Sequence, residues 1–198
     1  SCFIVEKGLE GFELGKAENK LGIRASDTCE LYFDNVKIPV ENLIGEEGQG
    51  FKIALSTLDG GRIGIASQAL GIAQASLEAS IKYSKERIQF NKPIAENQAI
   101  QYKIADMKME IDAARLLIWQ AAWQKDQKKN FSHHASMAKV YASEVAMRAS
   151  TQCVQIHGGY GYMRESGVER LMRDAKITQI YEGTSEIQRL VIARAVLK

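Results

Sequence analysis

The sequence lacks several features that mark specialised protein classes. It has no apolar run near the roughly 20 residues needed to cross a bilayer, which argues against membrane insertion. Its formal net charge of +2 is too small to indicate a nucleic-acid or membrane surface. Cys2, Cys29 and Cys153 show no paired spacing, which favours free thiols over a disulfide framework. With 45% hydrophobic and 25% charged residues, its 198 residues suit a globular protein with a real core.

The beginning of the chain lacks an initiator methionine and a signal-peptide pattern. Its first residues, SCFIVEKG, resemble a strand that has already begun, so we expect the chain to start inside a longer protein. Cys29, Leu31 and Phe33 alternate with their neighbours, and glycines supply turns, so residues 1–45 are predicted to be β-structure. The glycine-rich segment 45–50 then predicts a boundary near residue 46.

Helical periodicity dominates residues 46–198. Apolar side chains at three- and four-residue steps predict one long helix around residues 63–81. A stricter alternation of four and three predicts a second helix over residues 100–121, entered after Pro93. Such a pattern is typical of the seam in an antiparallel bundle.

Three more helices are predicted in the last third of the chain. One spans about residues 132–156, where small residues let backbones approach closely, and the stretch HGGYGY ends it. A shorter helix is expected around residues 164–178 and a last one over residues 185–197. Ser185 and Gln188 fit a capping box at the start of that last helix. The fold class is therefore predicted to be mainly α, an antiparallel helical bundle preceded by a β-segment.

Several common site patterns are missing. There is no Glu-x-x-His pair, and the adjacent His133 and His134 cannot share a helix face, so no metal site is expected. The glycines at 158–161 follow a helix rather than a strand, which argues against nicotinamide binding. Trp119 and Trp123 lie one turn apart and are predicted to pack in the core.

One segment, YEGTSEIQRL, places a carboxylate, a glycine and two hydroxyls just before a helix start. Such a carboxylate alone is usually a cap that stabilises the helix dipole. However, residues 180–190 resemble the acyl-CoA dehydrogenase motif that contains the catalytic glutamate. The same family's C-terminal signature is matched upstream by Gln155-x-x-Gly158-Gly159-x-Gly161-Tyr162, Glu165, Arg170 and Asp174.

The resemblance extends over the whole chain and is strongest to the short-chain, butyryl-CoA type. It implies the C-terminal half of such an enzyme. Residues 1–45 would be the end of a β-barrel-like middle domain, and residues 46–198 the C-terminal helical bundle domain. The isolated chain is expected to be inactive because the other half is needed.

The implied reaction is FAD-dependent α,β-dehydrogenation of short-chain acyl-CoA thioesters to trans-2-enoyl-CoA, in fatty-acid or branched amino-acid degradation. By resemblance, Glu182 is the base that removes the α-proton while hydride leaves for the flavin. Its backbone N–H, with a flavin hydroxyl, would hold the enolate oxygen. Tyr181 and Gly183 would contact the acyl chain, and Asp59 and Arg62 would line the CoA side of the substrate pocket.

The implied FAD contacts come from two subunits. Arg87 resembles the arginine that reaches the flavin pyrophosphate of a neighbouring subunit, a role suited to a guanidinium. The remaining implied cofactor residues are Gln98, Gln155, Ile156, His157, Gly158, Gly159, Thr184, Ser185 and Glu186. The family pattern implies a homotetramer built as a dimer of dimers, with electron-transferring flavoprotein as electron acceptor. The implied compartment is a bacterial cytoplasm or a mitochondrial matrix.

One departure from the family and two alternatives complete the prediction. Gly61 stands where some relatives acting on branched or long chains keep their base, so Glu182 has no rival there.

One alternative is a flavin-dependent oxidase on the same scaffold, although glutamate in YEGTSE favours the dehydrogenase because the nitroalkane branch uses aspartate. The other is a non-catalytic helical oligomerisation module. A branched short-chain substrate is the nearest competitor to butyryl-CoA.

Overall fold

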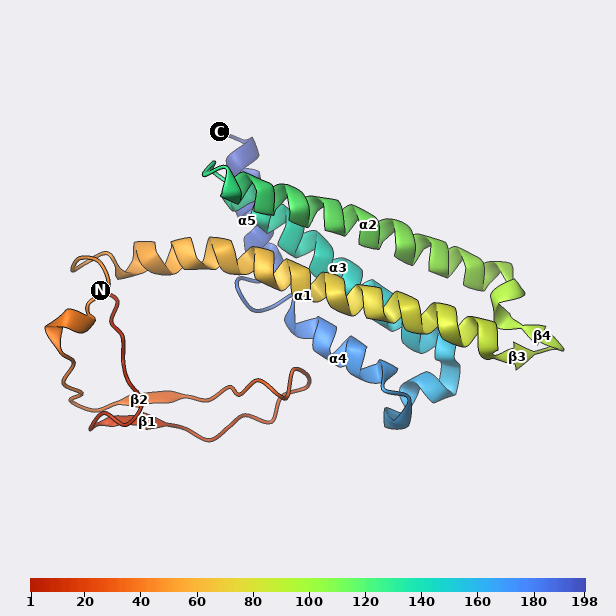
Figure 1. The fold of residues 1–198 in the computed structure, drawn as a ribbon, viewed down its shortest axis with the longest axis horizontal. Coiled ribbons are helices and arrows are strands. Elements are labelled where there is room, and N and C mark those ends of the chain that lie inside the picture. Colours follow the sequence, from red (N-terminus) through yellow and green to blue (C-terminus); the bar gives the residue numbers. More distant parts are fainter. The chain divides into compact units, whose positions relative to one another are not determined.

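The computed structural model describes all 198 residues, which form two compact units, residues 1–58 and 59–198. Five α-helices dominate the chain, with short 3-10 helices and two small two-stranded sheets (Figure 1). The predicted mainly helical fold is therefore confirmed. No helix combines the length and the apolar character that crossing a membrane requires.

The first unit contains the only antiparallel pair of strands in the predicted β-region. β1 (Phe12–Leu14) pairs with β2 (Leu31–Phe33), and the rings of Phe12 and Phe33 stack with centroids 5.0 Å apart. All three residues of β2 are more than half exposed, so neither face of this strand is covered within the chain. The unit ends at Leu58, inside α1, and the domain boundary near residue 46 stays a prediction.

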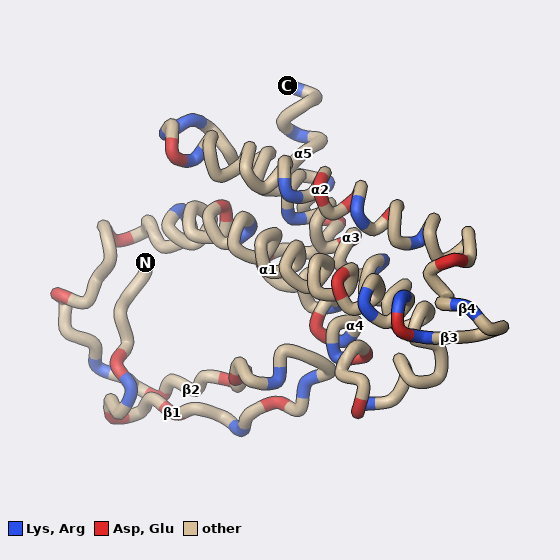
Figure 2. Tube along the Cα trace, turned by 45° about the vertical axis from the view of Figure 1, so that its right-hand side comes forward, with Lys and Arg blue, Asp and Glu red and all other residues tan.

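The second unit is built on three long helices. α1 (Gly50–Glu86), whose residues from Asp59 onward belong to this unit, is followed by α2 (Gln98–Asp126) and α3 (Ser132–His157). Consecutive helices run antiparallel (Figure 1). A hairpin of β3 (Ile88–Gln89) and β4 (Lys92–Pro93) turns the chain from α1 into α2. Basic and acidic residues are interspersed along these helices, with no stripe of one sign (Figure 2).

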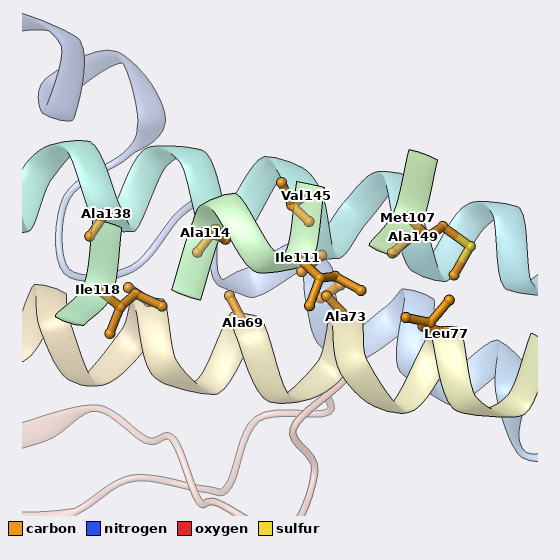
Figure 3. Packing of buried hydrophobic residues seen from close by; sticks show 14 of the residues in the cluster. Ala69, Ala73, Leu77, Met107, Ile111, Ala114, Ile118, Ala138, Val145 and Ala149 are labelled. Atoms are coloured by element: carbon orange, nitrogen blue, oxygen red, sulfur yellow. The ribbon is translucent and has the colours of Figure 1, made fainter. Parts of the chain in front are cut away.

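Small side chains bring the three helices together. Ala69 and Ala73 of α1 are fully buried and face Ile111 of α2, while Ala138 and Val145 of α3 close the same core (Figure 3). The predicted seam is confirmed, because its members from Met107 to Ala121 are buried. Alanine at these positions permits close backbone approach, and the long apolar residues fill the remaining space.

The predicted position of the two tryptophans is wrong. Trp119 is 62% exposed and Trp123 is 52% exposed, on the face of α2 that points away from the seam. Instead, the ammonium of Lys129 lies over the ring of Trp123, 4.8 Å from the ring centroid. Two aromatics one turn apart share a helix face, but their spacing does not say which face is buried.

The last two helices frame the segment that resembles the catalytic motif. α4 (Val168–Ile177) follows two 3-10 turns, Gly158–Tyr162 and Arg164–Ser166, and α5 (Ser185–Val196) ends the fold. Both α4 and α5 pack on α3. The three cysteines are free thiols, but only Cys153 is buried, whereas Cys2 and Cys29 are partly exposed.

The predicted capping box of α5 is wrong by one position. Thr184 is the N-cap, and its hydroxyl accepts a hydrogen bond from the N–H of Ile187 at 3.5 Å. Ser185 is the first helical residue and is buried. The Gln188 side chain turns instead to the loop before the helix, where it donates to two backbone carbonyls. A threonine next to a serine leaves the cap position ambiguous, since both hydroxyls can serve.

Candidate active site

The loop between α4 and α5 has an unusual backbone. Glu182 and Gly183 have φ values of 57° and 94°, two successive residues in the left-handed region. For a residue with a side chain, this conformation costs roughly 1–2 kcal/mol. The loop is closed on itself, because the N–H of Ser185 donates to the carbonyl of Gln179 at 3.0 Å. A non-glycine residue held in this region is a feature that clusters at functional sites.

The Glu182 carboxylate packs against bare backbone on α1. A Cβ atom built on Gly61 would lie 2.4 Å from Oε2 of Glu182, so the glycine leaves the space that the carboxylate occupies. That oxygen is buried and accepts no hydrogen bond from the chain. A buried carboxylate oxygen without a hydrogen-bond partner is rare, which makes Glu182 a candidate for a functional role.

A buried lysine lies beneath the same loop. The side chain of Lys139 on α3 is completely buried, and its Nζ donates to the carbonyl of Gly183 at 2.7 Å. Burial and the nearby Arg62 guanidinium lower the pKa of Lys139 to about 8, while the carboxylates of Glu182 and Glu186 oppose that shift. Lys139 belongs to none of the sequence motifs described above. A lysine within the small, apolar run that forms the buried face of α3 was the available signal.

The predicted substrate residues Asp59 and Arg62 form one network with the start of α3. Nη1 of Arg62 lies 2.6 Å from Oδ1 of Asp59, and the arginine is only 6% exposed. Ser132 donates to the same aspartate oxygen at 2.9 Å, and Ser136 lies 3.4 Å from the guanidinium. The structure thus brings both residues together and holds them between α1 and α3.

Tyr181 ties the loop to α1 by a second route. Its hydroxyl donates a hydrogen bond to the side-chain oxygen of Gln68. Burial raises the pKa of Tyr181, with Glu182 adding to the rise and the bond to Gln68 opposing it. The predicted substrate residues Tyr181 and Gly183 therefore flank the carboxylate of Glu182 in the chain and are fixed to different helices.

The residues just after the loop present polar groups at the start of α5. The hydroxyl of Ser185 is buried without a hydrogen-bond partner. Hydrogen bonds from the backbone at the helix start and from Thr184 lower the pKa of the exposed Glu186. All three of these predicted cofactor residues lie at one helix N-terminus, where backbone N–H groups favour anionic ligands.

A separate groove of about 520 Å³ opens at the far end of α1. The Arg87 guanidinium lies 5.5 Å above the ring of Tyr160, and the rings of Tyr83 and His157 stack 4.2 Å apart. Of the predicted cofactor residues, the groove is lined by Arg87, Ile156, His157, Gly158 and Gly159.

Besides Thr184, Ser185 and Glu186 at the start of α5, the predicted cofactor residues Gln98 and Gln155 lie outside this groove. Gln98 begins α2, where its amide donates to the hydroxyl of Tyr102. Gln155 is exposed near the end of α3. Neither lines the groove, so within one copy of the chain the structure gathers five of the predicted contacts there and leaves these two apart.

Comparison with known proteins identifies the family. Residues 48–197 match the family described as acyl-CoA dehydrogenase, C-terminal domain. A short-chain specific acyl-CoA dehydrogenase of Megasphaera elsdenii is 57% identical over the whole chain, as is a mitochondrial short-chain specific acyl-CoA dehydrogenase of Rattus norvegicus. The structure of butyryl-CoA dehydrogenase from Megasphaera elsdenii covers 99% of the chain at 58% identity, with a TM-score of 0.97.

The chain spans about half the length of these relatives, covering 52% and 48% of the two sequences and 51% of the solved structure. The match is nevertheless continuous through the helical unit that holds the loop of Glu182, the Arg62 network and the Arg87 groove. The resemblance seen in the sequence is thus confirmed, and the chain belongs to the acyl-CoA dehydrogenase family.

Proposed function

We propose that the protein containing this chain is an FAD-dependent acyl-CoA dehydrogenase that converts short-chain acyl-CoA thioesters of the butyryl-CoA type to trans-2-enoyl-CoA. The observation that carries the proposal is the carboxylate of Glu182. It is held on a left-handed backbone against the bare α-carbon of Gly61, with one oxygen buried and unpaired.

The chemistry of the substrate explains why such a carboxylate is needed. An α-proton of a thioester is only weakly acidic, so its removal requires a base that is desolvated and fixed close to it. Glu182 fits the requirement because its Oε2 is buried without a competing hydrogen bond, and because the carbonyls of Glu182 and Gly183 accept hydrogen bonds from buried side chains. We propose that Tyr181 and Gly183 lie along the acyl chain, and that Asp59 and Arg62 line the CoA side of the pocket.

The residues present fit FAD. The Arg87 guanidinium suits a pyrophosphate, and a Cβ built on Gly158 or Gly159 would meet nothing within 4 Å, so the groove is open at these two residues. At the start of α5, the unpartnered hydroxyl of Ser185 and its neighbour Thr184 offer further polar contacts. A bound flavin supplies the acceptor for the hydride that leaves the substrate β-carbon. We propose Gln98 and Gln155 as further contacts.

The separation of the two sites supports a shared cofactor. Gly61 beside the base and Tyr83 in the groove are 22 residues apart on α1, which is about 33 Å along a helix. This is farther than one extended FAD molecule reaches. We therefore propose that each flavin contacts the loop of Glu182 in one copy of the chain and the Arg87 groove in another copy.

An exposed apolar stripe on α2 supports the assembly that such sharing needs. Tyr102, Met109, Leu116 and Trp123 recur at seven-residue steps, joined by Trp119, and all are more than half exposed. A seven-residue repeat on a helix is typical of a helix–helix seam, and a contiguous exposed apolar patch marks an interaction surface. We propose that this stripe lies between copies of the chain in a homotetramer.

The electron acceptor and the compartment remain as proposals from the family resemblance. We propose electron-transferring flavoprotein as the acceptor. The relatives include a bacterial and a mitochondrial protein, in keeping with a bacterial cytoplasm or a mitochondrial matrix.

Anaerobic titration of the complete protein with butyryl-CoA tests the proposed function. We expect flavin absorbance that bleaches as substrate is added, with bleaching fastest for short, unbranched thioesters in a series that includes branched ones. Absence of flavin would instead favour the non-catalytic module. Rapid reoxidation of the reduced flavin by oxygen would favour the oxidase.

A further inference from the structure

Lys139 is the one fully buried lysine of the chain, and the proposed chemistry does not use it. No carboxylate lies within ion-pair distance of its ammonium, whose hydrogen bond goes to the carbonyl of Gly183 at 2.7 Å. Burying an ammonium without a paired carboxylate costs free energy that a well-packed apolar side chain would not. The energetic cost indicates that the hydrogen bond has a role beyond packing.

A second buried donor reaches the same backbone from another helix. Nε2 of Gln188, which is completely buried on α5, donates to the carbonyl of Gly183 at 2.8 Å and to that of Glu182 at 3.2 Å. A Cβ at position 183 would lie 2.7 Å from this nitrogen. The peptide groups on both sides of the Gly183 α-carbon are therefore held by side chains from α3 and α5.

These bonds act on the residue of the loop whose backbone is least restricted by its own side chain. Gly183, at φ 94°, has no side chain to restrict its backbone, and it is joined to Glu182, whose left-handed conformation is unfavourable. Without fixed carbonyls, rotation at Gly183 would let Glu182 relax and swing its carboxylate away from Gly61. A conformation of this kind persists only where the surrounding structure holds it.

The charge of Lys139 acts in the same direction. Its ammonium is attracted by the carboxylates of Glu182 and Glu186 and repelled by the Arg62 guanidinium. The attraction draws the Glu182 carboxylate toward the interior, although the two side chains form no ion pair.

Building on the proposed function, we propose that Lys139 is a positioning residue for the base. By holding the carbonyl of Gly183 together with Gln188, its ammonium fixes the backbone that aims the Glu182 carboxylate.

The test uses the complete, flavin-loaded enzyme with Lys139→Met, which keeps the length of the side chain and removes the donor. We expect the limiting rate of flavin bleaching by butyryl-CoA to fall by about 10- to 100-fold, the cost of misplacing a reacting group by roughly 1 Å or less. The half-saturating substrate concentration and the flavin content should change less than about threefold, because the binding residues are untouched. A small alkylammonium ion should restore part of the rate in Lys139→Ala and leave Lys139→Met unchanged.

Val145→Ala is the matched control, since Val145 is a fully buried core residue on the same helix. It should lower the melting temperature and leave the bleaching rate unchanged. A rate for Lys139→Met within about threefold of wild type, or an equal loss of rate in Val145→Ala, would overturn the positioning role. If Lys139→Met fails to fold, Gln188→Met is measured instead. The bleaching rate should then fall by about 10- to 100-fold, and a rate within about threefold of wild type would again overturn the proposal.

The two proposals fail in different ways. If the wild-type protein is not bleached by butyryl-CoA, the proposed function is wrong whatever the variants do. If wild type is bleached and Glu182→Gln is slow but Lys139→Met is normal, only the role of Lys139 is wrong.

Discussion

Replacing Gly61 by alanine probes the packing of the base directly. The added Cβ would lie 2.4 Å from Oε2 and 2.9 Å from Cδ of Glu182, whereas ordinary contacts begin at 3.4 Å. The difference, 3.4 minus 2.4, requires the carboxylate to retreat by about 1 Å. Both atoms that must move belong to the carboxylate of the proposed base, so we expect the change to act on chemistry before it acts on folding.

The size of the effect follows from that displacement. Misplacing a reacting group by 1 Å can cost about 100-fold in rate, or about 2.7 kcal/mol of activation free energy. Alanine is also favoured over glycine within a helix by about 1 kcal/mol, so the backbone of α1 should not be weakened. We therefore expect a folded, flavin-containing protein whose limiting rate of bleaching by butyryl-CoA falls about 100-fold.

Gly71→Ala provides the matched control for this variant. Gly71 lies on the same helix, and a Cβ there would meet nothing within 4 Å. This variant should keep the wild-type rate and gain the same helical preference. If Gly61→Ala reduces its flavin as fast as Gly71→Ala, the Glu182 carboxylate does not act from its position beside Gly61.

Three further predictions concern the cofactor, the assembly and the buried lysine. Arg87→Met should lose at least about tenfold in FAD affinity, measured as flavin retained after gel filtration, whereas the exposed neighbour Lys85→Met should retain it; equal retention would contradict the groove's role. Trp119→Glu should shift the protein to smaller species in sedimentation velocity, and an unchanged distribution would remove the α2 stripe from the interface. The pKa of Lys139, lowered to about 8, lies below that of an unfolded lysine, so the folded protein binds fewer protons between about pH 8 and 10.5. The free energy of unfolding of wild type should therefore rise relative to that of Lys139→Met as pH increases through that window, by up to about 3 kcal/mol. If the free energies of unfolding of the two proteins change in parallel with pH, this prediction is wrong.

Much of the fold was predictable because the spacing of apolar residues along each long helix indicates which positions are buried. The alternation of four and three from Ile100 to Ala121 matches the buried seam of α2, and the small residues of α3 match its buried face. The loop of Glu182 was singled out because residues 180–190 resemble a family motif, whereas a carboxylate before a helix would by itself indicate only a cap. The chain spans about half the length of the relatives that share this motif.

Other features depend on which helix faces which, and periodicity does not contain that information. Trp119 and Trp123 are exposed because the seam of α2 takes the opposite face. Lys139 reaches the carbonyl of Gly183 from α3, 44 residues away in the sequence, so only the packed structure shows that it shares this carbonyl with Gln188. The space left by Gly61 becomes meaningful only once the carboxylate is seen to fill it.

Replacing the base itself tests the central claim most directly. In the complete enzyme, Glu182→Gln preserves the shape of the side chain and removes its ability to take up a proton. We predict unchanged flavin content and butyryl-CoA binding, with anaerobic flavin bleaching slowed by about 10²- to 10⁴-fold. Bleaching at the wild-type rate would contradict the assignment of Glu182 as the base.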